Sequence, residues 1–218
     1  MNQNHPESSR SVQLHRRATR LEGFTILWNI VEAAIAIGSG AVAGSTALLA
    51  FGADSLIEVS SGVAVFWRLI RVGPTASPEE SDTADRRAHF LVGITFFLLA
   101  AWVLQDAIRS LILHEIPNES PVGIVLAIAS LLVMPLLAYA KQRTGREMGS
   151  KALEADAVET WLCAYLSATL LLGLLLHSWF GLWWSDPAAG LAMVPFMIWQ
   201  GFDTVKESRS EEVDESTA

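Results

Sequence analysis

Two short stretches of the chain place acidic and thiol side chains inside apolar sequence. The first holds Asp54 and Glu58, four residues apart, and the second holds Asp156, Glu159 and Cys163 at relative positions i, i+3 and i+7. If each stretch is helical, each set shares one face, because successive side chains turn by about 100°. Carboxylates and a thiol are ligands of divalent metal ions, so the spacing predicts two halves of a metal site.

The two stretches also match each other in sequence. Aligned at a shared opening, Ala-Leu-x-Ala, Asp54 falls opposite Glu159 and Glu58 falls opposite Cys163. The two stretches share few identical residues, but each copy puts two potential ligands four residues apart on one helical face. An ionisable group in an apolar membrane helix is unfavourable unless it has a function and a partner, so the repeat predicts that the two stretches meet.

Long apolar segments separate the charged parts of the chain. Of its 218 residues, 51% are hydrophobic and only 17% are charged, and most charges lie at the two ends and in two loops. The apolar segments predict six helices, each long enough to cross the roughly 30 Å hydrocarbon core of a bilayer. They run over about residues 21–42, 46–72, 86–113, 121–141, 152–176 and 186–202. The expected fold is an all-α polytopic membrane protein with six transmembrane helices.

The distribution of charge predicts three regions. Residues 1–20 form a cytoplasmic N-terminal arm, expected to be flexible or interfacial, and residues 21–203 form the six-helix transport domain. Residues 204–218 form an acidic, Ser-containing tail that is expected to be disordered. Within the transport domain, residues 141–151 are predicted to be a basic connector between two helices.

The positions of lysine and arginine predict the orientation in the membrane. Of the fifteen, all but Arg109 lie in the arm, the tail, the loops after the second and fourth helices, or the adjoining helix ends. Because basic segments stay in the cytoplasm, both termini are expected to be cytoplasmic. No cleavable signal sequence is visible before the first apolar segment, and the chain is predicted to be a multi-pass protein of the cell membrane.

This topology makes the two ligand-bearing helices antiparallel. With a rise of about 1.5 Å per residue, Glu58 then lies level with Glu159, and Asp54 lies level with Cys163, near the middle of the membrane. Four oxygen and sulfur ligands suit a tetrahedral zinc ion, and a thiolate admits softer ions such as cadmium. Without a cation the crowded carboxyl groups would favour their protonated forms, so binding must release protons. This chemistry predicts a transporter that exchanges a metal ion for protons.

Both stretches resemble one family of membrane proteins. The sequence S-T-A-L-L-A-F-G-A-D-S-L-I-E at 45–58 is similar to helix 2 of the cation diffusion facilitator (cation efflux) family of metal/proton antiporters. Residues 151–163 resemble that family's helix 5, whose usual form is A-D-A-x-H-x-x-x-D. The Asp-Pro pair at 186–187 is similar to the start of its last helix. The resemblance covers about residues 21–202 and implies a divalent metal ion as cargo, export from the cytoplasm, proton coupling and a homodimer.

Two ligand positions depart from the family pattern. Asp54 and Glu58 match the ligand positions of helix 2, whereas Glu159 stands where the family has histidine and Cys163 where it has a second aspartate. Exchanging an imidazole for a carboxylate and a carboxylate for a thiol changes ligand softness. The identity of the metal therefore does not carry over from the family. The oxygen and sulfur ligands make Zn²⁺ the expected ion, with Cd²⁺, Co²⁺, Mn²⁺ and Fe²⁺ as alternatives, and carboxylates must carry the protons. The tail is also too short for the family's C-terminal cytoplasmic domain, which this chain is expected to lack.

Several of these residues have a second interpretation. Asp156 is a candidate fifth ligand, or a helix-start or entry residue near the cytoplasmic end. Cys163 is a ligand or a small core residue. Asn29 and Glu32 share a face of the first helix, where they line the ion pathway or form a hydrogen bond between helices.

Other classes of function fit the sequence less well. The alternative to a transporter is a non-transporting membrane subunit that partners a metal transporter, as the two altered ligand positions allow. The chain has no Ser-His pair or HExxH motif at matching depth, so it is not expected to be an enzyme. No permanently bound cofactor is expected, and the net charge of −8 does not favour nucleic acid. The expected partners are the metal ion, protons, the lipid bilayer and a second copy of the chain.

Overall fold

The computed structural model describes residues 6–72 and 82–215, with side chains for residues 10–70, 93–150 and 152–206. All regular structure in these residues is helical, which confirms the all-α prediction. The six helices are α1 (Pro6–Ala43), α2 (Thr46–Val72), α3 (Asp82–Leu113), α4 (Pro121–Met148), α5 (Lys151–Phe180) and α6 (Ser185–Glu215).

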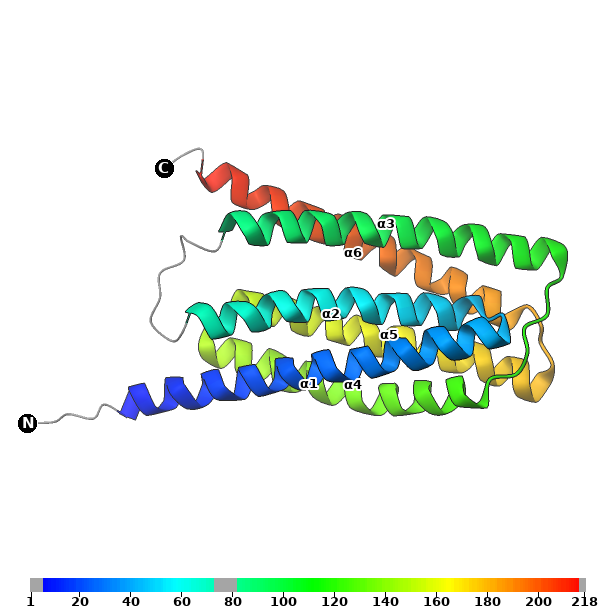
Figure 1. The fold of residues 1–218 in the computed structure, drawn as a ribbon, viewed down its shortest axis with the longest axis horizontal. Coiled ribbons are helices and arrows are strands. Elements are labelled where there is room, and N and C mark those ends of the chain that lie inside the picture. The colour runs from blue at the N-terminus through cyan, green and yellow to red at the C-terminus, as the bar shows by residue number, and fades with distance from the viewer. Residues whose placement is uncertain (1–5, 73–81, 216–218) are drawn as a thin grey trace, which may run out of the picture.

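The helices run side by side and alternate in direction along the bundle (Figure 1). The start of α1 and the end of α6 therefore lie at the same end of the bundle. The most extensive contacts join α1 with α2, α4 with α5, and α3 with α6, and α2 also contacts α5. The packing places α2 and α5, the two helices with the predicted ligands, next to each other inside the bundle.

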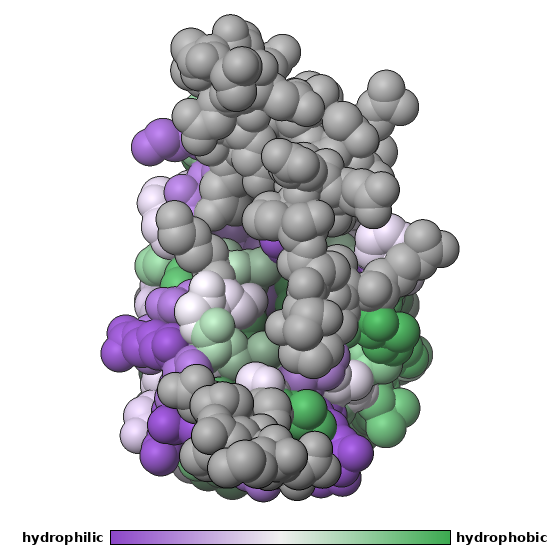
Figure 2. Space-filling view, turned by 90° about the vertical axis from the view of Figure 1, so that its left-hand side faces the viewer, coloured by the Kyte–Doolittle hydropathy of each residue, from purple (hydrophilic) through white to green (hydrophobic). Residues whose placement is uncertain are grey.

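Five of the described helices are long and apolar enough to cross a membrane, all except α6. Helix α6 has 31 residues and packs along α3, but prolines, glycines and polar residues such as Gln200 interrupt its apolar run. Six helices of a polytopic membrane protein are thus confirmed, while a membrane-spanning role for α6 stays a prediction. Figure 2 looks onto the end of the bundle where α1 starts and α6 ends, and it shows many hydrophilic residues among the described ones.

The two predicted terminal regions are more helical than expected. Helix α1 already begins at Pro6, and Ala18 is buried against Val65 and Leu153 in a small apolar cluster, so most of the arm is helix. Helix α6 continues to Glu215 through most of the segment expected to be disordered. Residues 7–20 and 202–215 contain no glycine and no proline. Nothing in these two extensions therefore breaks a helix that has already started. Residues 1–5 and 216–218 lie outside the described residues.

The predicted basic connector at 141–151 is also wrong. Helix α4 continues to Met148, and the chain turns into α5 at Gly149 and Ser150. Gly149 has φ 66°, a left-handed conformation that glycine adopts without strain, and the Ser150 hydroxyl accepts a hydrogen bond from the N–H of Leu153. Lys141 therefore lies inside α4, two turns before its end, and it is fully buried.

Candidate functional site

The two predicted half-sites face each other across α2 and α5. Asp54 and Glu58 on α2 are each 5% exposed, and Cys163 on α5 is 1% exposed. Asp54 interacts electrostatically with Glu58 and with Glu159, and Glu58 interacts with Cys163. Glu159 is less enclosed than the other three. The structure thus brings together three acidic side chains and the chain's single thiol.

These side chains do not form a closed coordination shell. In the part of the chain whose side chains are described, no three His, Cys, Asp or Glu residues are gathered closely enough to hold a metal ion. Carboxylates that face one another repel, so their oxygens are expected to move together only when a cation lies between them.

A glycine allows the helix with Asp54 to approach α1. A Cβ atom at Gly52 would lie 2.7 Å from Cγ1 of Ile37 and 3.0 Å from Cβ of Ala36. Because no larger residue fits without a shift of α1, this contact fixes the distance between α1 and α2 two residues before Asp54. The close approach brings the polar residues of α1 beside the ligand-bearing face of α2.

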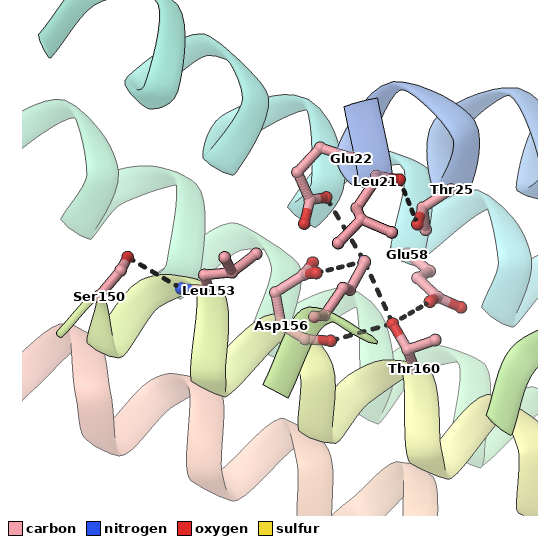
Figure 3. Close-up of polar contacts among 9 residues, drawn as sticks. Leu21, Glu22, Thr25, Glu58, Ser150, Leu153, Asp156 and Thr160 are labelled. Carbon is pink, nitrogen blue, oxygen red and sulfur yellow. Dashed lines mark hydrogen bonds and ion pairs between the residues drawn. The ribbon is translucent and has the colours of Figure 1, made fainter. Parts of the chain in front are cut away.

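The structure gives Asp156 a different partner from the predicted metal ion. Its Oδ2 atom accepts a hydrogen bond from Nζ of Lys141 on α4 (Figure 3). The Lys141 ammonium also lies 3.4 Å from Oε2 of Glu22 on α1 and donates to Oγ1 of Thr160 at 3.2 Å. Lys141 and Glu22 are both fully buried, and Asp156 is 2% exposed. An ammonium group therefore pairs with Oδ2 of Asp156, whereas Oδ1 is buried without a hydrogen-bond partner among the described residues.

Thr160 connects this buried ion cluster to the predicted metal site. Its hydroxyl donates to Oε1 of Glu58 at 3.0 Å and also lies 3.0 Å from the backbone oxygen of Asp156 (Figure 3). The contacts join side chains of four helices, because Glu22 belongs to α1, Glu58 to α2, Lys141 to α4, and Asp156 and Thr160 to α5. We call these five residues the Lys141 cluster.

Sequence reasoning missed Lys141, Thr160 and Glu22. Lys141 stands at the start of a basic segment, which made it look like a cytoplasmic loop residue. Lys141 nevertheless lies on the buried face of α4, which Met134, Leu137 and Ala138 form before it and Thr144 continues after it. A charged residue in register with a buried helical face was the signal that could have revealed the ion cluster.

Asn29 and Glu32 on α1 are buried without hydrogen bonds. Asn29 is 0% exposed and Glu32 is 1% exposed, and no side-chain nitrogen or oxygen of either has a hydrogen-bond partner among the described residues. Glu32 interacts electrostatically with Glu58, and the Ser55 and Ser130 hydroxyls lie near its carboxylate. Unpaired buried polar atoms are uncommon in folded proteins and need a ligand or water. Because Ser55 belongs to α2 and Ser130 to α4, a polar contact between helices at Glu32 stays a prediction beside a role in the ion pathway.

Comparisons with known proteins agree on one kind of protein. The cation efflux transmembrane domain matches residues 24–211 of the chain. The "Uncharacterized transporter sll1263" of Synechocystis sp. is 26% identical over 183 residues, which cover 83% of this chain and 59% of that protein. The "Uncharacterized transporter MJ0449" of Methanocaldococcus jannaschii is 26% identical over 187 residues, which cover 82% of this chain and 64% of that protein. The chain thus spans less than two thirds of the length of these curated relatives.

Proposed function

This chain belongs to the cation efflux family, and from that membership we propose that it carries a divalent metal ion, Zn²⁺ before the alternatives, across the membrane in exchange for protons. The proposal puts the ion between α2 and α5, with Asp54, Glu58, Glu159 and Cys163 as its ligands. The observation that supports it is the burial of Asp54, Glu58 and Cys163 on two adjacent helices, together with the electrostatic interaction between Asp54 and Glu159. Such groups are unfavourable in a membrane unless they bind something.

The ligand chemistry favours zinc over harder ions. Two or three carboxylate oxygens and one thiolate form a small, mixed set that suits a tetrahedral ion. Asp156 is left out of this set because Lys141 already pairs with it. When the ion leaves, its positive charge has to be replaced, and protons on the carboxylates of Glu58 and Glu159 would do this without a histidine.

We place the protein in the cell membrane as a homodimer with both termini in the cytoplasm, and we propose export as the direction of transport. The orientation is supported by the start of α1 and the end of α6, which lie at one end of the bundle (Figure 1), and by Arg109, which lies about one turn before the end of α3. The family is one of transporters, so the proposal involves no catalytic step.

Removing a ligand carboxylate is expected to abolish exchange. In proteoliposomes loaded with a pH-sensitive dye, a Zn²⁺ gradient should drive proton movement through the parent protein. Glu58→Gln and Glu159→Gln should lower the initial rate by at least about tenfold, because each removes a charge that the ion replaces. The same substitution at the exposed Glu115, which pairs with Arg109 at 3.2 Å, is the control and should leave the rate unchanged.

Two outcomes would contradict the proposal. If Glu58→Gln and Glu159→Gln exchange Zn²⁺ as fast as the parent protein, the ligand assignment is wrong. If the purified parent protein binds none of Zn²⁺, Cd²⁺, Co²⁺, Mn²⁺ or Fe²⁺ at micromolar concentrations, the protein is instead the non-transporting partner subunit.

A further inference from the structure

Lys141 lies among three buried oxygens. Its ammonium group donates hydrogen bonds to Oδ2 of Asp156 and Oγ1 of Thr160, and it forms an ion pair with Oε2 of Glu22 at 3.4 Å. The cation is thus fixed in place by one residue of α1 and two residues of α5.

Thr160 is held in one orientation by the same contacts. Its hydroxyl lies within hydrogen-bond distance of the backbone oxygen of Asp156, one turn earlier on α5, and this contact selects one of the few rotamers open to threonine in a helix. Because the hydroxyl oxygen accepts from Lys141, its single proton points away from the ammonium group. Two acceptors lie on that side of the hydroxyl, the backbone oxygen of Asp156 and Oε1 of Glu58, each at 3.0 Å.

The two oxygens of Glu58 are consequently not equivalent. Oε1 accepts the hydrogen bond from Thr160, whereas Oε2 is buried and has no hydrogen-bond partner among the described residues. A buried carboxylate oxygen without a partner is destabilising unless a ligand meets it. Asp54 and Cys163 both interact electrostatically with Glu58, so Oε2 is the oxygen left to bind an ion at the proposed site.

We infer that Thr160 is a specificity-determining positioning residue and that Lys141 holds it in place. This inference rests on the proposed metal transport. By occupying Oε1, Thr160 leaves Glu58 to bind the ion through Oε2 alone. A carboxylate that binds through one oxygen suits a small tetrahedral ion such as Zn²⁺, whereas larger ions with more ligands gain from a carboxylate that binds through both oxygens. The Lys141 cluster therefore selects Zn²⁺ over Mn²⁺ although none of Lys141, Thr160 and Glu22 touches the ion.

The test compares two substitutions at Thr160 in the full chain. Thr160→Val keeps the shape of the side chain and removes the hydroxyl, whereas Thr160→Ser keeps the hydroxyl. Purified protein in detergent is titrated separately with ZnCl₂ and MnCl₂. Thr160→Val should weaken Zn²⁺ binding by about tenfold, because a hydrogen bond to a charged ligand is lost, and should change Mn²⁺ binding by less than about threefold. Thr160→Ser should keep both affinities within about twofold of the parent protein.

The ratio of the two affinities distinguishes positioning from a general structural role. A role in packing alone would weaken both ions equally in Thr160→Val, and that result would overturn the inference, as would two variants that both match the parent. Thr160→Ala also lacks the hydroxyl and replaces Thr160→Val if that variant does not fold. A parent protein that binds neither ion would overturn the proposed transport function itself, and this inference with it.

Discussion

Replacing Lys141 with methionine is expected to lower the free energy of unfolding by about 3–5 kcal/mol, the usual effect of removing one partner from a buried ion pair. Lys141 and its partners Asp156 and Glu22 are at most 2% exposed. In Lys141→Met the buried carboxyl groups of Asp156 and Glu22 would lose the ammonium group that lies between them. Thermal unfolding in detergent, followed by circular dichroism, measures the effect as a large fall in Tm.

A control on the same helix separates this effect from a general one. Arg143 lies two residues further along α4, is exposed, and pairs with Glu147 at 3.0 Å. Arg143→Met likewise removes one basic charge and one ion pair, but exposed ion pairs contribute only about 0–1 kcal/mol to stability. Its Tm should stay close to that of the parent. Equal Tm values for Lys141→Met and Arg143→Met would show that the buried pairing does not stabilise the fold.

A compensated variant tests the cause of the instability. Adding Glu22→Gln and Asp156→Asn to Lys141→Met removes the two unpaired charges and should recover most of the lost stability, because neutral side chains are far less unfavourable in the interior. If the triple variant is as unstable as Lys141→Met, lost packing of the lysine stem explains the fall.

Replacing Cys163 with serine is expected to change which metal ions bind. The affinity for Cd²⁺ should fall by at least about 100-fold and that for Zn²⁺ by about tenfold or more, whereas the affinity for Mn²⁺ should change by less than about threefold, because only the softer ions gain from a thiolate. Cys163 is the only cysteine of the chain, so the variant contains no other thiol that could substitute for it. Isothermal titration with each ion measures the three affinities.

The control for this variant is a hydroxyl placed beside the site. Ala164 is the next residue of α5 and is also buried, so Ala164→Ser adds a hydroxyl at similar depth without touching the proposed ligand set. It should leave the three affinities in their parental order. If Cys163→Ser also keeps that order, with all affinities unchanged or lowered equally, Cys163 is a core residue and not a ligand.

The sequence predicted the helices well where their boundaries carry a chemical signal. The apolar segments required six helices, and the helix predicted over 46–72 and the helix start predicted at Pro121 agree with α2 and α4. Boundaries without such a signal were missed. A change between polar and apolar residues suggested helix boundaries near residues 21, 141 and 202. Polar residues, however, continue a helix equally well once it has begun. Polarity marks the edge of an apolar layer and does not mark the end of a helix.

The amino-acid sequence determined the membrane-protein class and the family, and it predicted the pairing of Asp54 and Glu58 with Glu159 and Cys163. Each of these follows from residue type and spacing along one or two helices, which are local properties. Only the tertiary structure decided that Lys141 pairs with Asp156 and is connected to Glu58 through Thr160. Spacing tells which residues share a face of one helix, but it does not tell which of the other helices packs against that face. The partner of a buried charge is therefore fixed by the packing of α1, α2, α4 and α5 together.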